Sequence, residues 1–256
     1  MPKKVLIAED NVVSQHAAKR FLEAIGCDVM VVEDGAAAVS ACARHEFGLV
    51  LMDLKMPRMD GIQATQEIRR QERAGRHVPI VALTAKSASD ELALCTAAGM
   101  NGLLTKPLEI ARLRQTLDRF GLARRTLEMP TPSGAPTEPE AGRPADEPVD
   151  LMTLHAKFSG DTLFVRRLCQ TFVTSTSQGL EELDSAVAAS ERNRVRLFAH
   201  KIRAAGSSMY AHRLAAIASN IESEAMTAAM PALAAAAQTL RRTFDEATLH
   251  IGARLP

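Results

Sequence analysis

Polar side chains that could take part in a reaction follow four short apolar runs in the first half of the chain. Glu9 and Asp10 come after the first run, Asp53 after another, and Thr84 and Lys106 after two more. Three like charges within a few Å repel strongly unless a cation joins them, and oxygen ligands favour a hard ion such as Mg²⁺. A carboxylate nucleophile, a divalent ion, a hydroxyl and an ammonium are together what phosphoryl transfer onto a carboxylate requires.

The elements that must position these groups are visible in residues 1–121. Short β-branched apolar runs alternate there with longer segments of helical period, which predicts an α/β fold with a doubly wound, five-stranded parallel sheet. The predicted strands are 5–8, 28–32, 49–52, 80–83 and 102–104, followed by helices beginning near 12, 35, 60, 87 and 108. The carboxyl ends of such strands meet at one edge, where these sheets bind ligands. Taken singly, each polar residue would more often be a helix cap or a surface charge; their convergence at one edge favours chemistry.

Four motifs carry a resemblance to a known family. Ala8–Asn11, Leu51–Gly61, Leu83–Ala85 and Thr105–Leu108 together resemble the receiver domain of two-component response regulators, a flavodoxin-like fold. The resemblance implies roles for the residues at the sheet edge: Asp53 as phospho-acceptor, Glu9, Asp10, Asp53 and the backbone carbonyl of Lys55 as Mg²⁺ ligands, and Thr84 and Lys106 as contacts of the phosphoryl oxygens.

Two further expectations come from the same resemblance. It implies a cis bond at Lys106-Pro107, which is consistent with the reduced trans preference before proline. Most receivers carry Tyr or Phe where this chain has Leu103. Because that aromatic changes rotamer on phosphorylation, the signalling face is expected to be weakly coupled here.

The pattern changes twice after the predicted sheet. From 122 to 150, six prolines fall among Glu, Gly, Thr and Ala, which predicts a flexible linker. From 151 to 256 no strand signal remains and apolar residues recur at spacings of three and four, with helix breaks or starts at Gly160-Asp161, Ser190 and Pro231. This region is predicted to be an all-α domain.

A histidine in that helical region is a second candidate site. His200 is expected on a helix face different from the apolar stripe of Phe198, Ile202 and Met209, so its imidazole should point outward. Neutral imidazole can be phosphorylated if an incoming receiver supplies the metal and the lysine. The alternative is an ordinary surface histidine on an amphipathic helix.

The segment around this histidine also resembles a family. Phe198–Met209, with Leu214 and Ile221-Glu222, is similar to the histidine phosphotransfer (Hpt) domain, a four-helix bundle, which implies that His200 is the phospho-carrier. Family members usually show Lys then Gly where this chain has Arg203 and Ala204, and commonly Gly in place of Tyr210. These departures predict slower transfer and an altered docking rim.

Composition excludes several classes of function. With 31 basic and 30 acidic residues the net charge is +1, which gives no broad electrostatic case for nucleic acid or an anionic membrane. The four cysteines form no C-x-x-C pair, the first apolar run is too short for a signal peptide, and no run suits a membrane span. A cytoplasmic protein is therefore expected. No Gly-rich nucleotide-binding segment or helix-turn-helix is left over, so we do not expect an autonomous kinase or a transcription factor.

The combined interpretation is a phosphorelay protein with Mg²⁺ as cofactor. Its expected partners are a sensor histidine kinase or hybrid kinase and another receiver or Hpt protein. The alternative is a phosphorylation-regulated binding module, or a phosphate sink that titrates a partner kinase. The predicted linker is long enough for the two domains to meet, which places transfer within one chain slightly ahead of transfer between chains.

Overall fold

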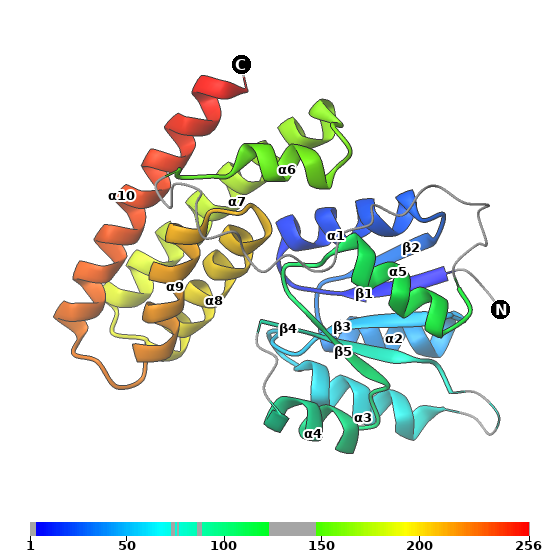
Figure 1. Cartoon of the computed structure of the whole chain (residues 1–256). Helices are drawn as coiled ribbons and strands as arrows, with labels where there is room; N and C mark the ends of the chain where they lie inside the picture. The colour runs from blue at the N-terminus through cyan, green and yellow to red at the C-terminus, as the bar shows by residue number, and fades with distance from the viewer. Residues whose placement is uncertain (1–3, 73–74, 76, 86–88, 123–146, 256) are drawn as a thin grey trace.

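The computed structural model of the chain describes residues 4–72, 75, 77–85, 89–122 and 147–255. Its first part is a five-stranded, all-parallel sheet of order β2-β1-β3-β4-β5, as predicted (Figure 1). The strands and helices alternate along the chain: β1 Lys4–Ala8, α1 Val12–Ala24, β2 Asp28–Val32, α2 Gly35–Arg44, β3 Leu49–Asp53, α3 Gly61–Gln71, β4 Ile80–Thr84, α4 Ser89–Ala97, β5 Gly102–Thr105 and α5 Ile110–Arg119.

Helices cover both faces of this sheet. Side chains of α1 and α5 pack on one face and those of α2 and α3 on the other, so β3 is buried along its whole length. The loop 54–60 connects β3 to α3 and folds back on itself, so that the Gly61 amide donates to the Leu54 carbonyl at 3.1 Å. A Cβ at Gly61 would lie 2.2 Å from the carbonyl oxygen of Asp53, so only glycine fits there. The close approach fixes the backbone that carries Asp53.

The second part of the chain is all helical. Its helices are α6 Leu151–Lys157, α7 Thr162–Ala188, α8 Arg192–Ser208, α9 His212–Glu224 and α10 Met230–Arg254. The four longer ones form the predicted bundle, with α7 and α9 each packed against α8 and α10. Gly160 and Ser190 fall between helices and adopt left-handed backbone, while Pro231 lies in the first turn of α10 and so marks a helix start. Within the described ranges, no helix combines the length and apolarity needed to cross a membrane.

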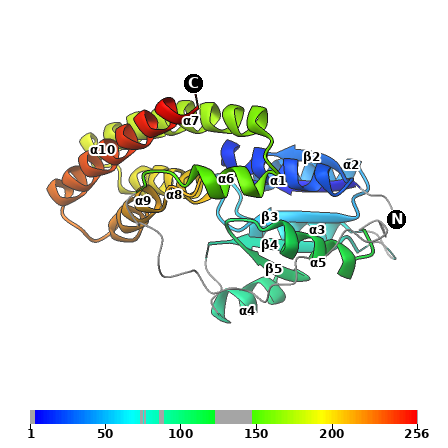
Figure 2. The same ribbon diagram turned by 45° about the horizontal axis from the view of Figure 1, so that its top comes forward.

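The predicted linker lies mostly outside the described residues. At its two ends Leu122 and Val149 are buried, and the Asp150 side chain accepts a hydrogen bond from the Thr153 amide at the start of α6. The bundle lies against α1, which contacts both α7 and α8 (Figures 1 and 2). Apolar packing is continuous across this junction, where the Phe21 and Phe158 rings stack with centroids 4.8 Å apart.

Candidate functional site

The structure brings the three predicted acids together. Glu9 and Asp10 follow β1, Asp53 ends β3, and one carboxylate oxygen of each lies within 4.8 Å of the others. Glu9 and Asp53 are buried, with 1% and 3% of their surface exposed. Neither oxygen of Asp10 has a hydrogen-bond partner among the residues that the structure describes. An all-oxygen donor set with unpartnered buried carboxylate oxygens fits a hard divalent cation such as Mg²⁺.

Lys106 neutralises two of these acids. It follows β5, and its Nζ lies 2.5 Å from Glu9 Oε2 and 2.6 Å from Asp53 Oδ2. Burial acts to lower the pKa of Lys106, but the Asp53 and Glu9 carboxylates outweigh it and the pKa rises. For Glu9, burial raises the pKa from 4.5 to about 8, with Lys106 opposing and Asp53 adding to the rise. Lys106 therefore remains charged, while Glu9 holds its proton far more tightly than an ordinary carboxyl.

Asp10 is neutralised from the other half of the molecule. The Lys201 Nζ, on α8, lies 3.5 Å from Asp10 Oδ2, and the Asp10 side chain is 3% exposed. Burial raises the pKa of Asp10, and the positive charge of Lys201 is the strongest influence opposing that rise.

The remaining predicted receiver residues lie around Asp53. The Lys55 amide donates to Asp53 Oδ1 at 3.1 Å, so the loop after β3 closes over the carboxylate. The Thr84 hydroxyl, at the end of β4, donates to Glu91 Oε2 at 2.5 Å in α4. The Lys106-Pro107 bond is cis, as expected. Thr84 would therefore have to exchange its bond with Glu91 to reach a phosphoryl group on Asp53.

His200 lies in the middle of α8, held from one side only. Its Nδ1 is 3.0 Å from Glu222 Oε1 and 2.9 Å from Arg203 Nη2, whereas Nε2 is buried without a hydrogen-bond partner in the described part of the chain. With its proton on Nδ1 the ring donates to Glu222 and keeps its lone pair on Nε2. That is the form a phosphoryl acceptor requires. Arg203 Nη2 is itself a donor, so in this tautomer its approach to Nδ1 is a close contact and not a hydrogen bond.

Glu222, on α9, links both domains to the histidine. It accepts from Arg203 Nε at 2.6 Å and forms an ion pair with Lys55 Nζ of the receiver half at 2.9 Å. Burial would raise its pKa, but the hydrogen bond from His200, together with the contacts of Lys55 and Arg203, prevails and the pKa falls well below its ordinary 4.5. The helices can meet this closely because a Cβ at Gly206 would lie 3.2 Å from the Ala215 amide nitrogen.

The prediction that the His200 imidazole points outward into solvent is wrong. His200 is 8% exposed, and Ala204 beside it is 5% exposed. Helix α9 supplies Glu222 next to the ring, and the receiver half lies against α8 at the adjoining residue Lys201. Arg203, one of the departures from the family pattern, is engaged with Glu222.

Two polar contacts near the site fix α8 on the receiver half. The Asn11 side chain caps α1 by accepting from the Val13 and Ser14 amides at 3.1 Å, and its Nδ2 donates to the Lys201 carbonyl at 2.9 Å. The hydroxyls of Ser14 and Ser208 lie 2.9 Å apart. These contacts hold α8 beside the residues that follow β1.

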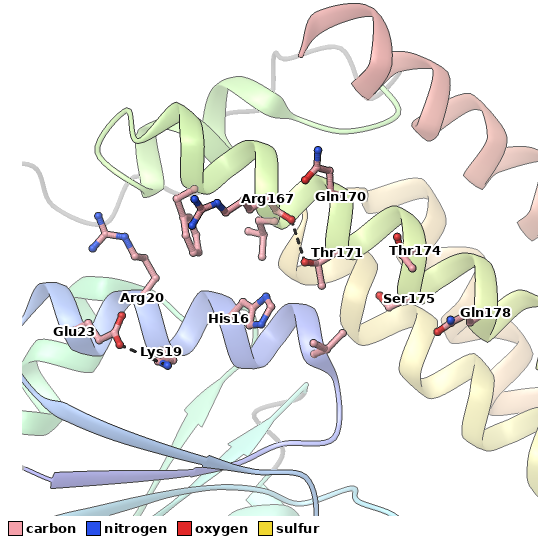
Figure 3. A pocket seen from close by; sticks show the side chains of 13 residues that line it. His16, Lys19, Arg20, Glu23, Arg167, Gln170, Thr171, Thr174, Ser175 and Gln178 are labelled. Atoms are coloured by element: carbon pink, nitrogen blue, oxygen red, sulfur yellow. Dashed lines mark hydrogen bonds and ion pairs between the residues drawn. The ribbon is translucent and has the colours of Figure 1, made fainter. Parts of the chain in front are cut away.

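A third group of contacts lies farther along α1. Arg20 Nη2 bonds to Asp161 Oδ2 at 2.9 Å, at the start of α7. Between α1 and α7 there is an open groove of about 760 Å³, lined on one side by His16 and Lys19 and on the other by polar α7 side chains such as Thr171 (Figure 3). The groove contains none of the predicted site residues.

Four residues of the site were not singled out from the sequence. Asn11, Lys201 and Glu222 lie only within quoted motifs, and Glu91 in none of them. Lys201 and Asp10 are far apart in sequence, and His200 and Glu222 lie on different helices. The helical period would have placed Lys201 off the apolar stripe, but only the packing of α8 against its neighbours reveals these pairs.

Comparison with known proteins agrees with this architecture. The profile described as response regulator receiver domain matches residues 5–118, and that described as Hpt domain matches residues 167–248. Sensor histidine kinase GacS of Pseudomonas protegens is 33% identical over 210 residues, covering 79% of this chain and 22% of that protein. This chain thus spans about a fifth of the length of that curated relative.

Two solved structures resemble the first part. One is the receiver domain of a sensor histidine kinase from Pseudomonas aeruginosa PAO1 with a magnesium ion coordinated in its active site cleft: 41% identity, 47% of this chain, 98% of that chain, TM-score 0.43. The other is a co-crystal structure of a Saccharomyces cerevisiae histidine phosphotransfer signalling protein with the receiver domain of its downstream response regulator: 30% identity, 46% of this chain, 88% of the matched chain, TM-score 0.43. With one profile matched on the sheet and the other on the bundle, the chain contains a response regulator receiver domain at 5–118 and an Hpt domain at 167–248.

Proposed function

We propose that this chain is a phosphorelay protein in which Asp53 accepts a phosphoryl group and His200 exchanges it with a receiver aspartate. The observation that carries the proposal is the state of His200: Nδ1 is held by Glu222, and Nε2 is buried and unpartnered in the described structure. A histidine kept only for packing would use both ring nitrogens or expose one to water. The adjoining residue Lys201 lies 3.5 Å from Asp10 Oδ2, so this part of α8 faces the acids.

The transfer step balances with the groups present. The lone pair of His200 Nε2 attacks phosphorus, the P–O bond to Asp53 breaks, and a P–N bond forms while Asp53 leaves as a carboxylate. Glu222 keeps the proton on Nδ1 and offsets the positive charge that the ring gains. Lys106, already 2.6 Å from Asp53 Oδ2, stabilises the departing carboxylate. The reverse direction uses the same groups.

Magnesium has an identified place in this proposal. Glu9, Asp10, Asp53 and the backbone carbonyl of Lys55 would hold the ion, which when bound supplies positive charge for the phosphoryl oxygens. Thr84 would turn from Glu91 to contact one of those oxygens. The phosphoryl group would come from a sensor histidine kinase or hybrid kinase, and another receiver or Hpt protein would exchange it onward.

The test labels the full chain with a small phosphoryl donor such as acetyl phosphate. Acid and base stability of the label then separate phosphohistidine from phosphoaspartate. The wild type should carry both labels, His200→Gln only phosphoaspartate, and Asp53→Asn neither. His16→Gln, an exposed histidine of the groove, is the matched control and should behave as the wild type. Phosphoaspartate in the wild type without phosphohistidine would favour the binding module or phosphate sink instead.

The docked arrangement favours transfer within one chain. The contacts of Asn11 and Ser14 place α8 of the same chain beside the acids, so no second molecule is needed to bring a histidine there. The rate at which label moves from Asp53 to His200 should therefore stay constant over a hundredfold dilution. A rate that falls in proportion to protein concentration would show that the step is bimolecular, and mixed Asp53→Asn and His200→Gln chains would then exchange label as fast as the wild type.

A further inference from the structure

The three acids of the receiver do not share their cations equally. Lys106 lies within 2.6 Å of both Glu9 and Asp53, whereas the one ion pair that Asp10 makes among the described residues is with Lys201 of the Hpt half. The Asp10 side chain is 3% exposed and neither of its oxygens accepts a hydrogen bond within the described structure. Asp10 is thus the acid whose charge is balanced from another domain.

The position of Lys201 is set by docking. Its backbone carbonyl accepts from Asn11 Nδ2 at 2.9 Å, and the Ser14–Ser208 hydroxyl pair holds the same two helices two turns away. Its side chain then spans to Asp10 at 3.5 Å, longer than a hydrogen bond, and 32% of that side chain stays exposed. An ammonium at this distance acts as a point charge that can swing into solvent.

We propose that Lys201 competes with the divalent ion for Asp10, so that docking of the Hpt half and metal loading of the receiver oppose each other. This inference rests on the magnesium site of the proposed function. Two cations close to the same buried carboxylate repel each other strongly, so the charge of Lys201 lowers the affinity of Asp10 for the ion. The coupling is reciprocal: if the docked Lys201 lowers the affinity for the ion by some factor, the bound ion disfavours docking by the same factor.

The experiment measures binding of MgCl₂ alone to the full chain by isothermal titration calorimetry. Lys201→Met keeps the length of the side chain and removes its charge, and it should tighten magnesium binding about tenfold. Lys201→Arg keeps the charge and should stay close to the wild type. Lys19→Met removes the same charge from an exposed site on α1 and is the control for net charge, with no change expected. Circular dichroism confirms that each variant is folded.

The outcomes separate this inference from the proposed function. If all four proteins bind magnesium with equal affinity, or if Lys201→Arg behaves as Lys201→Met, the competition is refuted while the magnesium site stands. If the wild type and Lys201→Met both fail to bind magnesium, the site itself is refuted and the competition with it. Phosphoryl transfer is not read at any point, so an effect of these variants on the adjacent His200 cannot be mistaken for one on the metal.

Discussion

Replacing Lys106 with methionine should lower the free energy of unfolding, because the acidic cluster then loses its buried positive charge. The side chain is 11% exposed, and its partners Glu9 and Asp53 are 2% and 4% exposed. Removing one partner of a buried ion pair typically lowers the free energy of unfolding by about 3–5 kcal/mol, because the other charge is left buried and unpaired. We expect a loss of that order for the metal-free receiver half.

The loss should depend on pH in a defined direction. In the folded wild type Glu9 has a pKa of about 8, against 4.5 ordinarily. A carboxyl whose pKa is raised on folding stabilises the native state at low pH and loses that contribution as pH rises through the folded value. For wild-type Glu9 the loss is complete above about pH 8. Without Lys106 the pKa of Glu9 rises further, so stability of the variant should keep falling above pH 8 by about 1.4 kcal/mol per pH unit.

Urea unfolding followed by circular dichroism, in chelator at pH 6, 8 and 9, measures both effects. Excess Mg²⁺ should then restore about 2.7 kcal/mol at a hundred times its dissociation constant. Lys19→Met, whose side chain is 46% exposed, should change little. The reasoning is refuted if the curves of wild type and Lys106→Met run parallel above pH 8, or if metal leaves the stability of the variant unchanged.

Three other substitutions have defined expected outcomes. Asp53→Asn should leave the thermal unfolding temperature near that of the wild type while mass spectrometry detects no phosphate uptake; uptake in that variant would contradict the acceptor assignment. Glu222→Gln should slow transfer to His200 by roughly ten- to a hundredfold in rapid-quench experiments, since a hydrogen bond to a charged group is worth about 1.5–3 kcal/mol. Because the pKa of Glu222 is lowered on folding, its stabilisation is present above pH 4.5 and lost below, so the variant should show a shallower acid-side fall in stability. Phe158→Ala removes the ring stacked on Phe21 and should enlarge the radius of gyration seen by X-ray scattering; an unchanged radius would show that the polar contacts alone hold the domains.

The sequence was sufficient for the receiver site because one topological rule places all its residues. In a parallel sheet every strand ends at the same edge, so Glu9, Asp53 and Thr84 needed only a correct strand assignment to be brought together. The predicted strand ends differ from the observed ones by a single residue: β3 and β4 extend to Asp53 and Thr84 themselves. The strand period of two residues and the helix period of 3.6 residues are local patterns, so the sequence alone is enough to assign these strands.

No comparable rule places one domain on another. Lys201 meets Asp10, and Lys55 meets Glu222, through an interface whose partners are more than 160 residues apart in each case. Helical periodicity placed His200 off the apolar stripe of its own bundle, yet it could not tell solvent from a second domain. This explains why the predicted solvent exposure of His200 is wrong. Burial in a two-domain chain also depends on contacts between the domains, and neither the strand period nor the helix period describes those.

Asn11 gives this interface a means of telling one receiver from another. Its side-chain oxygen caps α1 by accepting from two backbone amides, and its side-chain nitrogen donates to the carbonyl of Lys201, the residue next to His200. Aspartate in its place would still cap the helix, but it would set an acceptor against an acceptor. Exchange of a single NH₂ for an oxygen thus leaves folding almost untouched while it penalises recognition. Selection or protein engineering could therefore change which receiver this histidine accepts without rebuilding either domain.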